Sequence, residues 1–142
     1  MRKLLFLLIP VLFVALPFTS YSEDDVVTAK PAVYGVMLYA DWCGSCKALD
    51  PKITQAREGA KLDTQDVLFI TLDLTNDVAK HQSAMMATSL GFSEVYEKNA
   101  GKTGFMILVD ANTGEKLAQV TNKYKPTEIA AKIQESIKAA KS

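Results

Sequence analysis

The sequence is poor in the residues that build most specialised sites. Its 142 residues include two cysteines and one histidine, too few for a disulfide-rich scaffold or for a zinc site with four Cys and His ligands. Lysine and arginine number 16, as do aspartate and glutamate. The resulting zero net charge lacks the basic excess that nucleic-acid binding requires, so no nucleic-acid partner is expected. Apolar residues make up 49% and charged residues 23%, which argues against long disorder, collagen and a multi-span membrane protein.

Long apolar runs are also scarce, except near the N-terminus. A basic start at residues 2–3 precedes an apolar stretch over residues 4–18. As a helix this stretch would reach about 22 Å, short of a hydrocarbon core of about 30 Å. Ser20 and Ser22 stand where signal peptidase reads small residues. We therefore predict a cleaved signal peptide over residues 1–22, with a retained membrane anchor facing outside as the alternative.

The predicted export has consequences for the rest of the chain. Residues 23–31 are polar and are expected to form a flexible lead-in, and residues 32–142 a single domain. About 110 residues can bury one hydrophobic core. The protein would be periplasmic or secreted, in a compartment where disulfides persist. An even charge and no obvious apolar stripe beyond the core favour a monomer.

Alternating apolar segments predict an α/β domain. Strands are expected over residues 32–40, 67–74, 105–109 and 116–120, and helices over 43–60, 77–89, 93–98 and 127–141. Strands that alternate with helices pair in parallel through right-handed crossovers, whereas the last two strands form an antiparallel hairpin. The predicted fold is a central mixed four-stranded sheet with helices on both faces.

Two of the predicted helices indicate which face should point inward. The last helix has an isoleucine at every fourth position: Ile129, Ile133 and Ile137. In the helix over residues 77–89, Asn76 is the expected N-cap. In the same helix region, the larger apolar residues near one face are Val78, Met85 and Leu90. We expect their side chains to pack inward.

The chemically distinctive segment is Trp42-Cys43-Gly44-Ser45-Cys46, at the junction of a buried strand and a helix. Unpaired N–H groups and the dipole at a helix start favour an anion, so the pKa of the Cys43 thiol should be lowered. Cys46, one turn later, should be more buried and able to attack a mixed disulfide and release the substrate. Gly44 and Ser45 permit the tight turn, and Trp42 is expected to shield one side of the sulfurs.

Other interpretations of the two cysteines remain open. They could form a purely structural disulfide, although closing so short a loop removes only about 2 kcal/mol of chain entropy. They could form half of a copper or zinc site, with His81, Met85 and Met86 as the other ligands. They could also be two unrelated buried cysteines. Taken alone, His81 is interpreted as a surface residue of a helix, and the two methionines as core and surface filler.

Residues 39–47, YADWCGSCK, resemble the active-site segment of the thioredoxin superfamily. This segment is most similar to the corresponding segment of exported members, such as the C-terminal domain of DsbD-type disulfide reductases. Pro51, five residues after Cys46, matches the helix-kinking proline of the family. Residues 72–75 resemble the end of the next strand, and residues 104–110 the late hairpin. The similarity spans roughly residues 32–140.

The resemblance implies a thioredoxin fold and thiol–disulfide exchange with partner proteins. Cys43 would be the nucleophile and Cys46 the resolving thiol, with no cofactor besides this redox-active pair. An exported reductant of partner disulfides is the favoured function, and its candidate electron donor is a membrane thiol protein. The alternative is a non-enzymatic binding module of the same fold, a metal carrier or a chaperone, in which the disulfide is static.

The sequence departs from the family pattern at two places. Met37 stands where the family has a buried acidic residue, so the proton of Cys46 would need water, Asp41 or Asp73 as its acceptor. Thr103-Gly104 stands where the family has a cis-proline, and a trans bond is expected before glycine. In the family this loop holds the substrate backbone by β-pairing. Thr103 and Gly104 are therefore the candidate docking loop, and the insert over residues 92–103 a candidate for a different recognition surface.

Overall fold

The central element of the computed structural model, which describes residues 30–142, is one mixed sheet. Its strands are β1 (Val33–Tyr39), β2 (Val67–Asp73), β3 (Phe105–Asp110) and β4 (Lys116–Thr121), in the order β2-β1-β3-β4. β1 pairs with β2 in parallel, and the β1–β3 and β3–β4 pairs are antiparallel. The predicted fold class is thus confirmed. The predicted signal peptide and most of the lead-in lie outside the described residues.

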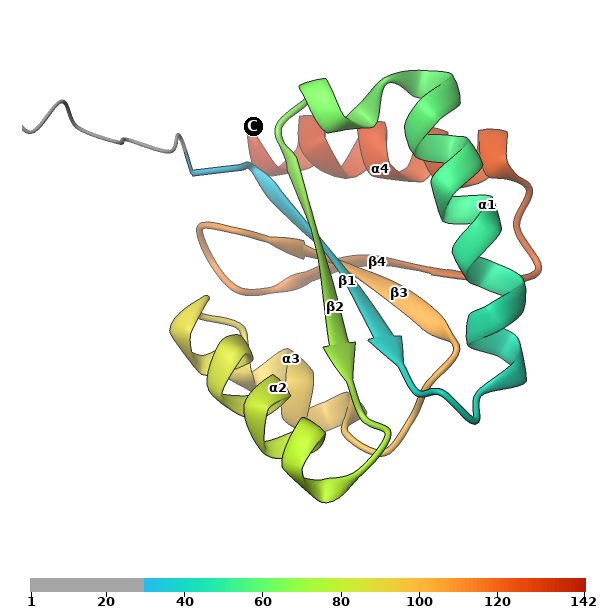
Figure 1. Cartoon of the computed structure of the whole chain (residues 1–142). Helices are drawn as coiled ribbons and strands as arrows, with labels where there is room; N and C mark the ends of the chain where they lie inside the picture. The colour runs from blue at the N-terminus through green and yellow to red at the C-terminus, as the bar shows by residue number, and fades with distance from the viewer. Residues whose placement is uncertain (1–29) are drawn as a thin grey trace, which may run out of the picture.

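Helices cover both faces of the sheet (Figure 1). On one face lie α1 (Gly44–Ala60) and α4 (Pro126–Ala140), and on the other α2 (Asp77–Ser89) and α3 (Ser93–Asn99). A short 3₁₀ helix, η1 (Leu62–Thr64), follows α1 where the sequence predicted no element. No helix within residues 30–142 has the length and apolar character needed to cross a bilayer.

Side chains of the sheet alternate between two separate hydrophobic cores, one on each face of the sheet. From β1, Val33 and Met37 join the core under α1 and α4, whereas Val36 and Leu38 join the core under α2 and α3. A strand buried on both faces reads as a continuous apolar run, which is why β1 could be predicted from its composition. The inward face predicted for α4 is confirmed, since its three isoleucines are buried: Ile129, Ile133 and Ile137.

The inward face of α2 differs from the prediction. Val78 is 71% exposed and Met85 59%, so the expectation that these two side chains pack inward was wrong, whereas Leu90, just after the helix, does pack against the core under α2 and α3. Met86 is also exposed, and neither methionine fills the core. The side chains that do point inward are small: Ala79, Ser83 and Ala87.

A close approach of α2 to β2 explains this choice of face. The Ser83 hydroxyl donates to the carbonyl oxygen of Asp73 at 2.8 Å, so that α2 lies directly against the end of the strand. The predicted N-cap is confirmed, because the side chain of Asn76 accepts from the N–H of Ala79 at 3.0 Å.

Candidate active site

The two cysteines lie at the turn from β1 into α1 and are joined by a disulfide, with their Cα atoms 5.3 Å apart. Cys43 is the N-cap of α1 and has extended backbone angles. Its sulfur accepts from the N–H of Cys46 at 3.1 Å, one of the N–H groups that a helix start leaves without an intrahelical partner. The Cys43 sulfur thus lies at the helix start, the position predicted from the sequence.

The two sulfur-bearing residues differ in their surroundings. Cys43 keeps 6% of its surface exposed, whereas Cys46 is fully buried, and both belong to the core under α1 and α4. The Cys46 sulfur lies 3.6 Å from the carbonyl oxygen of Leu38. In the reduced protein this carbonyl would accept a hydrogen bond from the Cys46 thiol. An incoming sulfur can therefore reach Cys43 more readily than Cys46.

The first turns of α1 carry the other residues of the motif. Gly44 and Ser45 begin the helix and are exposed, and Pro51 lies inside it. Because proline has no N–H, the helix lacks one backbone hydrogen bond at Pro51.

The candidate docking loop lies directly beside the cysteines. The peptide bond before Gly104 is trans, and the N–H of Gly104 donates to the carbonyl oxygen of Leu38 at 3.1 Å. Gly104 has φ +91°, and a Cβ there would lie 2.6 Å from the Cβ of Ser45 and 3.5 Å from the sulfur of Cys43. The fold therefore brings Gly104, which follows Thr103 in the candidate docking loop, against the first turn of α1, and the absence of a side chain at residue 104 permits this approach.

Trp42 points away from the core and contacts the loop after β2. Its side chain is 63% exposed, and its Nε1–H donates to the carbonyl oxygen of Thr75 at 3.3 Å. The neighbouring N–H of Asp41 donates to the Thr75 hydroxyl at 3.1 Å. Thr75 could not be identified as part of the site from the sequence, because these contacts join residues more than 30 positions apart.

The structure gives Cys46 no buried carboxylate partner. Met37 belongs to the same apolar core as Cys46. Asp41 and Asp73 are both exposed, and one oxygen of Asp73 accepts from the N–H and the hydroxyl of Thr75, at 2.8 and 2.5 Å. Among residues 30–142, the buried polar side chains are two serines.

The residues considered as metal ligands are not brought together with the cysteines. His81, Met85 and Met86 are exposed on α2, which covers the face of the sheet opposite the core that contains Cys43 and Cys46. In the described part of the chain, no three His, Cys, Asp or Glu side chains form a group that could hold a metal ion.

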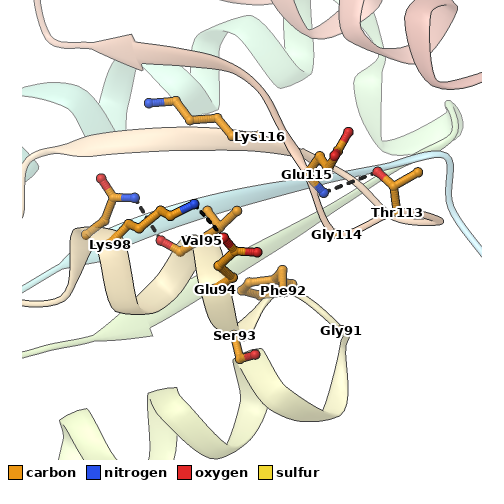
Figure 2. Close-up of a pocket in the computed structure, with 11 residues that line it drawn as sticks. Gly91, Phe92, Ser93, Glu94, Val95, Lys98, Thr113, Gly114, Glu115 and Lys116 are labelled. Atoms are coloured by element: carbon orange, nitrogen blue, oxygen red, sulfur yellow. Dashed lines mark hydrogen bonds and ion pairs between the residues drawn. The ribbon is translucent and has the colours of Figure 1, made fainter.

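A cavity of about 670 Å³ lies between the start of α3 and the β3–β4 turn (Figure 2). The insert over residues 92–103, the candidate for a different recognition surface, forms part of its wall. The Lys98 ammonium bonds to the Glu94 carboxylate there at 2.6 Å, and this hydrogen bond lowers the pKa of Glu94. None of the residues of the Trp42–Cys46 segment lines this cavity.

Comparison with known proteins is consistent with this geometry. The Thioredoxin family model matches residues 18–123, and the chain therefore belongs to the thioredoxin family. Chloroplastic thioredoxin F of Oryza sativa subsp. japonica is 33% identical over 95 residues, which cover 67% of this chain and 45% of the relative. Protein disulfide-isomerase A3 of Gallus gallus is 32% identical over 80 residues, 56% of this chain and 15% of the relative. The chain thus spans less than half the length of either relative.

Solved structures show the same fold at low sequence identity. The thioredoxin of Malassezia sympodialis has a TM-score of 0.50 at 21% identity, with 78% of this chain and 82% of that chain covered. A thiol:disulfide interchange protein of the thioredoxin family from Chlorobium tepidum TLS has a TM-score of 0.52 at 15% identity, with 76% and 81% covered. The predicted thioredoxin fold is confirmed.

Proposed function

We propose that the protein is a thiol–disulfide oxidoreductase that exchanges its Cys43–Cys46 pair with disulfides of partner proteins. The observation that carries this proposal is the placement of Cys43 at the N-cap of α1 with Cys46 bonded to it and buried one turn later. The family membership supports it, as do relatives that are named thioredoxin and protein disulfide-isomerase.

The first step would be an attack by Cys43. In the reduced protein, the Cys43 thiolate attacks one sulfur of a partner disulfide, a new S–S bond forms, and the other partner sulfur leaves as a thiolate. The N–H of Cys46, which points at the Cys43 sulfur from 3.1 Å, and the start of α1 stabilise negative charge on the attacking atom.

The second step would release the partner. Cys46 loses its proton and attacks the Cys43 sulfur, which reforms the internal disulfide and expels the second partner sulfur as a thiolate. Two electrons thereby pass to the partner, and the partner disulfide is reduced. Because no buried carboxylate accompanies Cys46 among the described residues, we propose that water accepts its proton.

The compartment and the direction of electron flow are part of the proposal. The basic start and apolar stretch of residues 2–18 support export to the periplasm or secretion. The similarity of residues 39–47 to DsbD-type reductases supports a reductant that receives electrons from a membrane thiol protein. We propose a monomer whose redox-active group is this cysteine pair, without a further cofactor.

Trapping the partner tests the function. A Cys46→Ser variant retains the attacking thiol but cannot resolve the mixed disulfide, so a partner should remain covalently attached to Cys43 and be identified by mass spectrometry. The double variant Cys43→Ser/Cys46→Ser is the matched control and should trap nothing. Cys43→Ser should also abolish turnover of a model disulfide. Trapping by the double variant, or turnover by Cys43→Ser, would contradict the assigned roles.

The low exposure of Cys43 also favours a second candidate, a binding module with a static disulfide. Alkylation of the reduced protein at pH 6 separates the two functions. A thiolate stabilised at the helix start reacts fast, whereas an ordinary thiol with a pKa near 8.5 reacts slowly at this pH. Stoichiometric copper or zinc in the purified protein would identify the module as a metal carrier.

A further inference from the structure

We propose that Thr75 is a positioning residue that holds the two residues before Cys43, and that Asp73 fixes the orientation of the Thr75 hydroxyl. We call Asp73 and Thr75 the clamp. This inference rests on the proposed function, because it names side chains that keep Cys43 and Trp42 aligned for disulfide exchange.

Thr75 contacts the active-site turn through two separate groups. Its hydroxyl accepts from the backbone N–H of Asp41 at 3.1 Å, and its carbonyl oxygen accepts from the indole N–H of Trp42 at 3.3 Å. One residue in the loop after β2 therefore holds both the backbone and the side chain that precede the attacking sulfur.

Asp73 determines which way the Thr75 hydroxyl points. A threonine hydroxyl has one proton to donate and lone pairs to accept with, whereas an ionised carboxylate can only accept. The Thr75 hydroxyl is 2.5 Å from an oxygen of Asp73 and therefore donates its proton there. This leaves the lone pairs for the N–H of Asp41. The N–H of Thr75, which donates to the same Asp73 oxygen at 2.8 Å, further fixes the pair.

The clamp lies where the neighbouring strands β1 and β2 end together. Tyr39 of β1 pairs with Asp73 of β2, and the carbonyl oxygen of Tyr39 accepts from the N–H of Leu74 at 2.7 Å. Between this pair and α1, the turn closes with a bond from the N–H of Cys43 to the carbonyl oxygen of Ala40 at 3.1 Å. This local bond shapes the turn, and Thr75 anchors it to the rest of the domain.

The test replaces the threonine hydroxyl in the full chain. Thr75→Val keeps the shape but removes the acceptor for Asp41, and Thr75→Ser restores a hydroxyl. Thr113→Val is the matched control: the Thr113 hydroxyl likewise accepts from a backbone N–H, that of Glu115 at 3.2 Å, but in the β3–β4 turn.

Two readouts report on the site directly. Trp42 is the one tryptophan of the chain, so acrylamide quenching of tryptophan fluorescence measures the exposure of this ring alone. The initial rate of alkylation of the reduced protein at pH 6 measures the reactivity of Cys43. Thr75→Val should slow alkylation about fivefold, the equivalent of one ordinary hydrogen bond, and should increase quenching of Trp42. Thr75→Ser and Thr113→Val should stay within about twofold of the original protein.

Several outcomes would overturn the proposal. One is that Thr75→Val leaves the alkylation rate and the quenching unchanged. Another is that Thr75→Ser or Thr113→Val slows alkylation as much as Thr75→Val does. If Thr75→Val does not fold, Asp73→Ala serves instead, because it leaves Thr75 in place and removes the partner that orients its hydroxyl. Asp73→Ala must change both readouts in the same direction, and unchanged values would refute the role of the clamp.

Failure of the clamp and failure of the proposed function can be told apart. Neither readout requires a disulfide substrate, so the clamp can be tested even if the protein reduces no model disulfide. Conversely, a protein that turns over a model disulfide but whose Thr75→Val variant keeps both readouts retains its proposed function and lacks the clamp.

Discussion

Substituting Gly104 by alanine would test whether the candidate docking loop needs a residue without a side chain. Two separate costs are expected. Gly104 has φ +91°, a conformation that alanine rarely adopts, and the added Cβ would lie 2.6 Å from the Cβ of Ser45. Real Cβ contacts are longer than this, so the loop must move away from α1 or the first turn of α1 must shift.

The structure offers a control that separates these costs. Gly101 has φ +89°, almost the same angle, but nothing lies within 4 Å of an added Cβ there. Gly101→Ala should therefore cost only the backbone strain, about 1–2 kcal/mol of the free energy of unfolding. Gly104→Ala should cost about 1–3 kcal/mol more, the usual penalty for overpacking.

Urea denaturation of the oxidised proteins gives these free energies, and a second substitution checks the cause. Ser45→Gly removes the atom that the new Cβ would meet. The double variant Ser45→Gly/Gly104→Ala should recover at least about 1 kcal/mol relative to the sum of the single variants, as residues in contact do. Equal losses for Gly101→Ala and Gly104→Ala, or strict additivity of the two substitutions, would refute the contact between the loop and α1.

Three further predictions concern the rest of the domain. Gly114→Ala would place a Cβ against the carbonyl oxygen of Gly91, a backbone atom that cannot turn aside; urea denaturation should show a loss of at least about 3 kcal/mol. Ile133→Ala should cost about 2–5 kcal/mol by the same assay, because this side chain is fully buried. Burial raises the pKa of Tyr96, so the folded state holds its phenolic proton more tightly than the unfolded state. Stability should therefore fall as the pH rises above about 10, and Tyr96→Phe should remove this part of the pH dependence measured by urea denaturation.

The fold could be predicted because its strands and most of its helices carry local patterns. β1 and β3 are apolar runs buried on both faces, and the isoleucines of α4 repeat at the spacing of one helical face. The packing of α2 could not be predicted in this way. Its position depends on how closely it approaches β2, and the residues that allow this approach, Ala79 and Ser83, rank low by hydrophobicity.

The site shows the same division between local and distant information. Cys43 and Cys46 could be placed at a helix start because strand, motif and helix follow one another in the sequence. Thr75 could not, since it acts through groups of Asp41 and Trp42 that only the fold brings near. The order Asp73-Leu74-Thr75 is a signal for a turn in which a side chain bonds to nearby backbone, but it does not indicate a partner elsewhere in the chain.

The carbonyl group of Leu38 lies close to both the candidate docking loop and the resolving cysteine. Its oxygen accepts from the N–H of Gly104 at 3.1 Å and lies 3.6 Å from the sulfur of Cys46. A carbonyl stabilises a thiol by accepting its hydrogen bond but cannot remove its proton, and the neighbouring Met37 side chain cannot do so either. In the proposed reaction, the start of α1 would stabilise a thiolate at Cys43, whereas the end of β1 would stabilise a thiol at Cys46. It follows that resolution of the mixed disulfide, rather than its formation, should be the slower step at neutral pH.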